Sequence, residues 1–142
     1  MNNPDDFYIF SDDENILQII VSRNSKYILS RSDSKNSYVS PLKLWDILNK
    51  KLVRELHIDK KYDPLPHSMS FTPDGNKIII GLWNYLIIIF DFQSGNIQET
   101  VKLNVRPHIF SPDGKMFLSI GEKLDLWETM TGNHVRTLWV AD

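Results

Sequence analysis

Histidines are the residues of this sequence best suited to bind a metal ion or transfer a proton, and there are four: His57, His67, His108 and His134. They are scattered along the chain, without the short spacing that lets histidines of one element share a zinc ion. His67 and His108 lie near the start of expected strands, where a metal site would need ligands converging from other strands. We interpret all four as ordinary polar residues and predict no metal site.

Other catalytic motifs are missing from the sequence. It contains no nucleophile elbow, phosphate-binding loop or calcium loop. With no cysteine, it can form neither a disulfide nor a thiolate metal site. We therefore expect no enzyme activity and no cofactor. A chain without cysteine also fits a reducing compartment.

Acidic residues form a local negative cluster near the N-terminus: Asp5, Asp6, Asp12, Asp13 and Glu14. We interpret this cluster as a solvated terminus and loop, with a docking segment for a basic partner as the alternative. The net charge of the whole chain is −2. A broad nucleic-acid surface would need a basic excess, so we expect no nucleic-acid partner.

The composition, 42% hydrophobic and 24% charged, is typical of a soluble globular chain. The longest uncharged apolar run, Ile78–Phe90, is shorter than the roughly 20 residues that a membrane-spanning helix needs. The first residues, Met1–Asp6, lack the basic start and apolar stretch of a secretory signal. We expect a cytoplasmic protein with no membrane partner.

A sequence repeat sets the architecture that must position any functional residue. The segment Phe71–Gly75 recurs as Phe110–Gly114, 39 residues further along. Each copy is followed by an apolar residue, an aromatic residue and an acid, which are Ile89–Asp91 and Leu126–Glu128. A weaker copy precedes both, with Val21–Lys26 in the place of the first motif and Leu44–Asp46 in the place of the second.

Each repeat divides into four extended segments rich in branched and aromatic residues, and turn-forming residues separate these segments. We therefore predict an all-β chain with an N-terminal segment, 1–15, and three units, 16–60, 64–103 and 104–142. The expected strands are Ile16–Val21, Lys26–Ser30, Leu42–Ile47, Leu52–Ile58, His67–Phe71, Lys77–Trp83, Tyr85–Phe92, Ile97–Leu103, Val105–Phe110, Met116–Ile120, Lys123–Glu128 and His134–Val140.

Two local patterns bear on this assignment. The run Tyr85–Phe90 does not alternate polar and apolar residues, which indicates a strand covered on both faces. By contrast, Pro41 and the apolar spacing from Leu44 to Leu56 would alone favour an amphipathic helix. We prefer strands there, because Leu44–Asp46 matches the other two copies.

Units of this length, with four strands and an aromatic-acid pair closing the third, resemble WD40 repeats. The resemblance covers nearly the whole chain from about Ile16 and implies a partial β-propeller of three four-stranded antiparallel blades. The sequence departs from the family pattern in two respects. The Asp that the family carries in the second hairpin has no clear counterpart, with Asp33, Asn84 and Glu122 the nearest residues. The Gly-His pair before the innermost strand is absent, so the family's buried His–Ser–Asp–Trp network is expected to be incomplete.

Three blades are fewer than the four to eight that close a propeller. The chain is expected to be a piece of a longer propeller, to self-associate, or to persist as an open stack. Phe7–Phe10 is expected to form an additional outer strand.

Exposed aromatic residues are the best candidates for binding a protein partner. Trp83 and Tyr85 flank Asn84 in the expected second hairpin of the middle unit, on the rim where WD40-like proteins usually meet partners. The alternative for Trp83 is packing against the neighbouring blade. The same rim is expected to carry three further residues, Tyr38, Tyr62 and Arg106.

Two classes of function follow. The first is a non-catalytic protein-interaction scaffold, whose loops on one rim bind partners that the sequence does not identify. The second is a fragment of a propeller-type hydrolase, such as a lactonase or the propeller of a peptidase. A truncated propeller piece without independent function is a third possibility.

Overall fold

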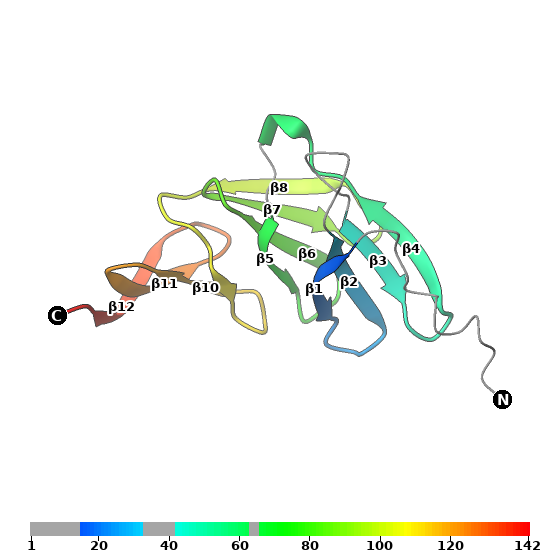
Figure 1. Cartoon of the computed structure of the whole chain (residues 1–142), viewed down its shortest axis with the longest axis horizontal. Helices are drawn as coiled ribbons and strands as arrows, with labels where there is room; N and C mark the ends of the chain where they lie inside the picture. Colours follow the sequence, from blue (N-terminus) through cyan, green and yellow to red (C-terminus); the bar gives the residue numbers. More distant parts are fainter. Residues whose placement is uncertain (1–14, 33–41, 63–65) are drawn as a thin grey trace. The chain divides into compact units, whose positions relative to one another are not determined.

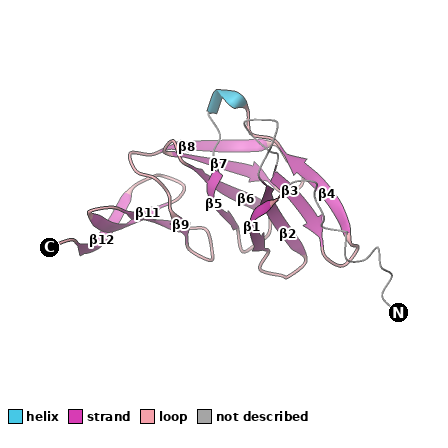
Figure 2. Cartoon of the chain, viewed as in Figure 1, coloured by secondary structure: helices cyan, strands magenta, loops and turns pink. Residues whose placement is uncertain are grey.

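The computed structural model describes residues 15–32, 42–62 and 66–142, and their regular secondary structure is almost entirely β (Figures 1 and 2). Within these ranges, twelve strands form three four-stranded antiparallel sheets, each in sequential strand order. The chain is thus an all-β partial propeller of three blades. No helix in the described part of the chain has the length and apolar character needed to cross a bilayer.

Each sheet is one blade of the propeller. The first blade contains β1 (Ile16–Val21), β2 (Tyr27–Ser32), β3 (Leu42–Asp46) and β4 (Lys51–Leu56), and a short 3-10 helix, η2 (Lys60–Tyr62), follows it. The second blade contains β5 (Pro66–Phe71), β6 (Lys77–Leu82), β7 (Leu86–Asp91) and β8 (Ile97–Lys102). The third contains β9 (Ile109–Phe110), β10 (Met116–Ile120), β11 (Lys123–Glu128) and β12 (His134–Val140).

The chain divides into two compact units, residues 1–62 and 63–142. The first unit holds the first blade, and the second unit holds the second and third blades. The expected outer strand Phe7–Phe10 and the acidic cluster, Asp5 to Glu14, lie outside the described residues.

Most expected strands agree with the structure to within one or two residues, but one is wrong. The innermost strand of the third blade, expected over Val105–Phe110, is only Ile109–Phe110. Pro107 explains the difference, because it has no N–H to donate to β10. The helix that the spacing around Trp45 would favour is also absent: Trp45 lies in β3, which pairs with β4.

The first recurring turn shows why the weak copy is a true repeat. In the second blade, the Thr72 hydroxyl donates to Asp74 at 2.6 Å. The backbone N–H of Asn76 donates to the same carboxylate oxygen at 2.9 Å. Ser111 and Asp113 make the same bonds in the third blade, and Ser22 and Asn24 make them in the first. The next position has positive φ in all three turns and is Ser25, Gly75 or Gly114.

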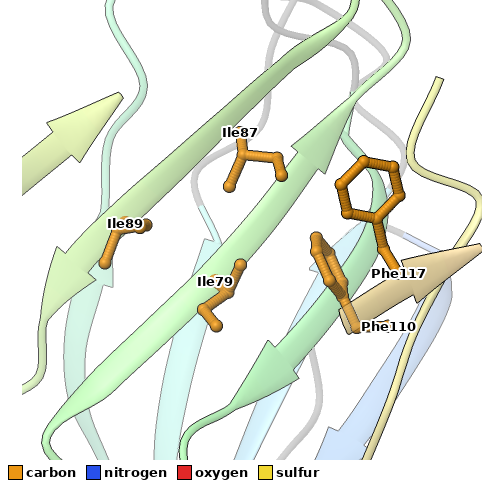
Figure 3. Close-up of a cluster of buried hydrophobic side chains, with 5 residues drawn as sticks. All are labelled: Ile79, Ile87, Ile89, Phe110 and Phe117. Atoms are coloured by element: carbon orange, nitrogen blue, oxygen red, sulfur yellow. The ribbon is translucent and has the colours of Figure 1, made fainter. Parts of the chain in front are cut away.

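A cluster of buried side chains joins the second and third blades (Figure 3). Ile79, Ile87 and Ile89 face Phe110 and Phe117 of the third blade, and all five are buried. Burying apolar side chains of this size contributes roughly 1.5–3 kcal/mol each. This interface fixes the loops of the two blades relative to one another.

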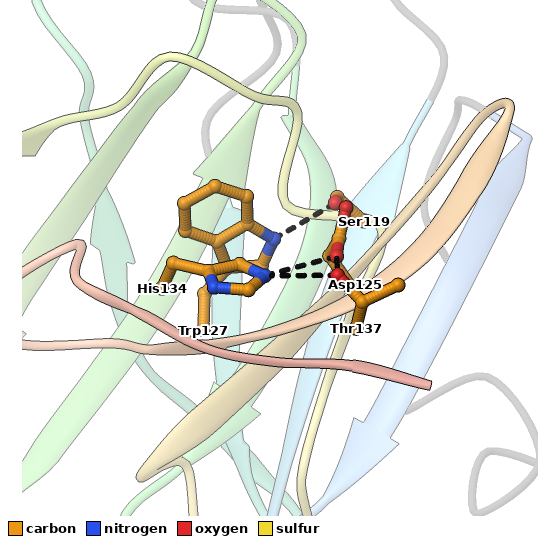
Figure 4. Close-up of polar contacts among 5 residues, drawn as sticks. All are labelled: Ser119, Asp125, Trp127, His134 and Thr137. Carbon is orange, nitrogen blue, oxygen red and sulfur yellow. Dashed lines mark hydrogen bonds and ion pairs between the residues drawn. The ribbon is translucent and has the colours of Figure 1, made fainter. Parts of the chain in front are cut away.

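The third blade also contains a polar network on the face that meets the second blade (Figure 4). The Trp127 indole N–H donates to the Ser119 hydroxyl at 2.8 Å. Asp125 accepts hydrogen bonds from Thr137 and His134. In the first blade, Trp45 donates to Ser30 in the same way, at 2.9 Å. The Trp–Ser part of the network that the family resemblance implies is therefore present in both blades.

Candidate interaction surface

The hairpin between β6 and β7 presents two aromatic side chains at one end of the second blade. Trp83 and Tyr85 are 42% and 47% exposed, while the flanking Leu82 and Leu86 are buried. Tyr85 has a φ of 66°, a left-handed conformation that residues other than glycine rarely adopt. The Leu103 amide donates to the Tyr85 carbonyl at 2.8 Å, so the adjoining strand end holds this conformation in place.

Arg106, in the loop between β8 and β9, binds this hairpin. Its guanidinium carbon lies 4.0 Å from the centre of the Trp83 ring and 5.9 Å from that of Tyr85. Its Nε also donates to the Trp83 carbonyl at 3.3 Å. Cation–π contacts at exposed sites contribute about 0.5–1 kcal/mol. Arg106 therefore joins the loop that enters the third blade to the aromatic pair of the second.

Two histidines extend the cluster beneath Trp83. The His67 ring lies 4.4 Å from the Trp83 ring, and His108 meets His67 edge-on at 5.2 Å. The Nδ1 atom of His108 lies 3.2 Å from the Ile120 amide and 3.0 Å from the Arg106 carbonyl. It accepts a hydrogen bond from the amide in one tautomer and donates to the carbonyl in the other. Trp83 thus packs against His67 of its own blade and Arg106 of the β8–β9 loop, and it still exposes part of its ring.

A pocket of about 450 Å³ adjoins this cluster. Tyr85 and the β8–β9 loop line one side, and the β10–β11 hairpin lines the other. Its charged side chains are Arg106, Lys123, Glu122 and Asp125. Hydrogen bonds from Thr137 and then His134 lower the pKa of Asp125, so this carboxylate is engaged within the blade. The pocket therefore offers two cationic groups, the Glu122 carboxylate and an aromatic wall to a partner side chain.

The structure brings together three of the five residues expected to bind partners: Trp83, Tyr85 and Arg106. Tyr38 lies outside the described residues. Tyr62 is half-buried in η2, in the first unit, and the Lys61 ammonium lies 4.9 Å from its ring centre.

Sequence reasoning missed the contribution of the β10–β11 hairpin to this surface. Lys123 and Ser119 line the pocket, yet neither was a candidate. A signal existed, because Glu122 occupies the place that Asn84 has in the second blade. A binding surface predicted around the hairpin at Asn84 should therefore also include the equivalent hairpin at Glu122. Within the part of the chain that the structure describes, no three acidic or histidine side chains are grouped as metal ligands.

Comparison with known proteins shows the fold. No family model matches the sequence, and no curated protein matches it. Solved structures do match. Hydrazine synthase from Kuenenia stuttgartiensis has a TM-score of 0.66 at 18% identity, over 92% of this chain and 38% of that one. The Cps50 (Swd1) β-propeller domain from Myceliophteria thermophila has a TM-score of 0.63 at 16% identity, over 90% of this chain and 40% of that one. The RRP9 WD40 repeats have a TM-score of 0.63 at 16% identity, over 92% of this chain and 40% of that one.

The fold is that of a partial β-propeller. The last two matches are propeller or WD40-repeat structures by name, and their likeness extends over the described blades of this chain. The chain spans only about two fifths of the length of each matched structure.

Proposed function

We propose that this partial propeller is a WD40-like, non-catalytic scaffold that binds a protein partner through Trp83, Tyr85 and Arg106. The observation that carries the proposal is the stack of Arg106 on two half-exposed aromatic rings at the β6–β7 hairpin. Tryptophan, tyrosine and arginine are the residues most enriched at binding hot spots. The side chains of Trp83 and Arg106 are held against one another and Trp83 also packs on His67, so less side-chain freedom remains to be lost on binding.

The adjoining pocket supports the same proposal. A side chain of the partner can enter it, and the contacts around the aromatic pair can then exclude water from these hot-spot residues. Arg106 and Lys123 can donate to acidic or carbonyl groups of the partner, and Glu122 can accept from a basic group. We place no nucleic acid and no membrane among the partners.

Affinity capture from a cell extract tests this function. The bait is the full chain, compared with Trp83→Ala and with Arg106→Ala. We expect each variant to lose at least about tenfold of a specifically captured protein, because truncating a hot-spot residue costs 2 kcal/mol or more. The matched control is Leu48→Ala, which removes an exposed side chain from the β3–β4 turn. Capture that is equally strong with all four baits would contradict the proposed surface.

Metal analysis of the purified chain tests the non-catalytic part of the proposal. A propeller hydrolase of the lactonase type needs a divalent ion held by converging side chains. We expect less than one bound ion per several chains after dialysis. One stoichiometric divalent ion would favour the hydrolase instead.

A further inference from the structure

Arg106 is the fixed cation of the pocket beside the β6–β7 hairpin, and its contacts leave part of its guanidinium unused. The Trp83 ring covers the group at 4.0 Å, and the Nε atom donates to the Trp83 carbonyl at 3.3 Å. Among the described residues, the terminal amines of Arg106 donate to no protein group, and no carboxylate pairs with this side chain. A guanidinium carries N–H donors on all three nitrogens, so both terminal amines remain available to a bound group.

The geometry of these free donors matches a carboxylate. Two parallel N–H groups of an arginine bind the two oxygens of a carboxylate at once, which a lysine cannot do. Because Nε of Arg106 is engaged with the hairpin, the end-on pair, Nη1 and Nη2, is left for such a contact. Stacking on Trp83, with the Tyr85 ring 5.9 Å away, holds the guanidinium in place, so less side-chain freedom is lost on binding.

The other side of the pocket adds two donors. Lys123 is exposed, and no carboxylate of the described residues lies within ion-pair distance of it. Ser119 is only 7% exposed and also lines the pocket. Its oxygen accepts from the Trp127 indole, so its hydrogen can donate to an occupant. Donors therefore reach the pocket from both the β8–β9 loop and the β10–β11 hairpin.

The two acids of the pocket set the charge that it accepts. Asp125 is engaged in its own blade, because it accepts from Thr137 and His134, and its side chain is only 14% exposed. Glu122 is exposed in the turn between β10 and β11, where solvent and salt screen its charge. These acids still repel a doubly charged phosphate more strongly than a group with one negative charge. A carboxylate therefore suits the pocket better than a phosphate.

We propose that the pocket binds one carboxylate, carried by a glutamate or aspartate side chain of an extended segment of the partner. Nη1 and Nη2 of Arg106 donate to its two oxygens, Ser119 and Lys123 supply further donors, and the Tyr85 ring covers the carbon atoms that carry the group. This inference rests on the proposed function, because it specifies the chemistry of the partner that this surface binds.

Nuclear magnetic resonance of the isotope-labelled full chain tests the chemistry directly. The probes are pentapeptides with acetylated and amidated ends that differ only in the central residue, which is glutamate, glutamine, lysine or phosphoserine. We expect the glutamate peptide to shift the indole signal of Trp83 and the Nε–H signal of Arg106. It should bind at least about tenfold more tightly than the glutamine peptide, because hydrogen bonds between charged groups are roughly twice as strong as neutral ones. The lysine and phosphoserine peptides should both bind more weakly than the glutamate peptide.

Variants then assign the contact. Arg106→Gln should remove the preference for glutamate over glutamine, and Arg106→Lys should keep only part of it, because it retains the charge without the paired donors. Glu122→Gln should bind the glutamate peptide at least as tightly as the unaltered chain. The matched control is Arg136→Gln, which removes an exposed arginine from β12 and should leave peptide binding unchanged. Circular dichroism of each variant checks that the β-structure is kept.

The outcomes separate this inference from the proposed function. Equal binding of the glutamate and glutamine peptides, or of neither, would overturn the carboxylate site, and so would tighter binding of the lysine peptide. If Trp83→Ala and Arg106→Ala still lose a captured protein in that case, the partner surface stands without the carboxylate. If glutamate is selected through Arg106 but capture is unaffected by these variants, the carboxylate site stands and the proposed function fails.

Discussion

The second and third blades share a sequence pattern but differ in what surrounds them. In the second blade, the residues of β6 and β7 from Ile78 to Ile80 and from Ile87 to Phe90 are at most 2% exposed, on both faces of the sheet. In the third blade, Phe110 and Phe117 are buried in the contact with the second, while Leu118, Leu124 and Leu126 on the other face are only half-buried. Burial is therefore set by the neighbouring blade and not by the repeat itself. A repeat protein is stabilised by its interfaces as much as by its units.

Core truncation should expose this difference most strongly. Ile89→Ala in the second blade and Leu126→Ala in the third remove side chains from equivalent positions. We expect the first to cost about 3–4 kcal/mol, because it leaves a cavity in a tightly packed interface. The second should cost only about 1 kcal/mol, since the side chain is still partly solvated in the folded chain. Urea unfolding followed by circular dichroism measures both.

Substituting two glycines of the recurring turn distinguishes the cost of backbone strain from the cost of disturbing the contact between blades. Gly75 and Gly114 both have a φ near 70°, but a Cβ at Gly75 would meet no atom within 4 Å, whereas one at Gly114 would lie 2.8 Å from Cδ1 of Ile79. Gly75→Ala should therefore cost about 1 kcal/mol for the left-handed conformation alone. Gly114→Ala should cost about 2–3 kcal/mol, because the buried Ile79 side chain or the turn itself must also shift. Equal losses in urea unfolding would show that the blades yield without cost at this point.

The tryptophan of the third blade tests a polar difference between the blades. Trp127 donates to Ser119, while the second blade has the apolar pair Phe90 and Ile80 at the aligned positions. Trp127→Phe should cost about 1–2 kcal/mol, because the buried Ser119 hydroxyl loses its donor. Adding Ser119→Ile should restore most of that loss, since replacing both partners by apolar groups is nearly neutral. A double-mutant cycle without coupling would show that the hydrogen bond contributes nothing.

The sequence predicted the three-blade architecture because turns and strands are local. Asp74 and Asp113 form side-chain bonds to residues two positions away, so the motif that reveals the repeat also makes the turn. The non-alternating run Tyr85–Phe90 likewise indicated burial on both faces, and Ile87 to Phe90 are fully buried. What the sequence did not show was the length of β9, because Pro107 shortens a strand without changing the apolar pattern around it.

The candidate site was predictable only in part, because it is made between elements. Trp83 and Tyr85 could be placed on one hairpin by their spacing around Asn84. The stacking of Arg106 on Trp83 and the pocket beside it depend on how the β8–β9 loop crosses that hairpin. No local pattern carries this information, since the two residues are 23 positions apart.

Among the expected differences between the second and third blades, the smallest is the effect of acid on the free energy of unfolding. Asp74 in the second blade has a lowered pKa because Thr72 and the Asn76 amide donate to it. The third blade has two such groups, Asp113 and Asp125, with the hydroxyls of Ser111 and Thr137 as the main causes. A carboxyl whose pKa is lower in the folded state stabilises the chain above its ordinary value of 3.8. This stabilisation is lost as pH falls through the folded pKa.

The free energy of unfolding should therefore be steady from neutral pH down to about pH 5 with respect to these groups, and then decrease below about pH 4. Asp125→Asn should be less stable than the unaltered chain at neutral pH, and the two should converge in acid, because protonated Asp125 no longer accepts as a carboxylate. Asp74→Asn is the matched variant in the second blade. Replacing both Asp113 and Asp125 by Asn should reduce the acid-induced loss of unfolding free energy more than Asp74→Asn does. Urea unfolding at a series of pH values measures this. A constant difference between Asp125→Asn and the unaltered chain at all pH values would mean that the carboxylate acts through shape rather than charge, and the acid response would then not separate the blades.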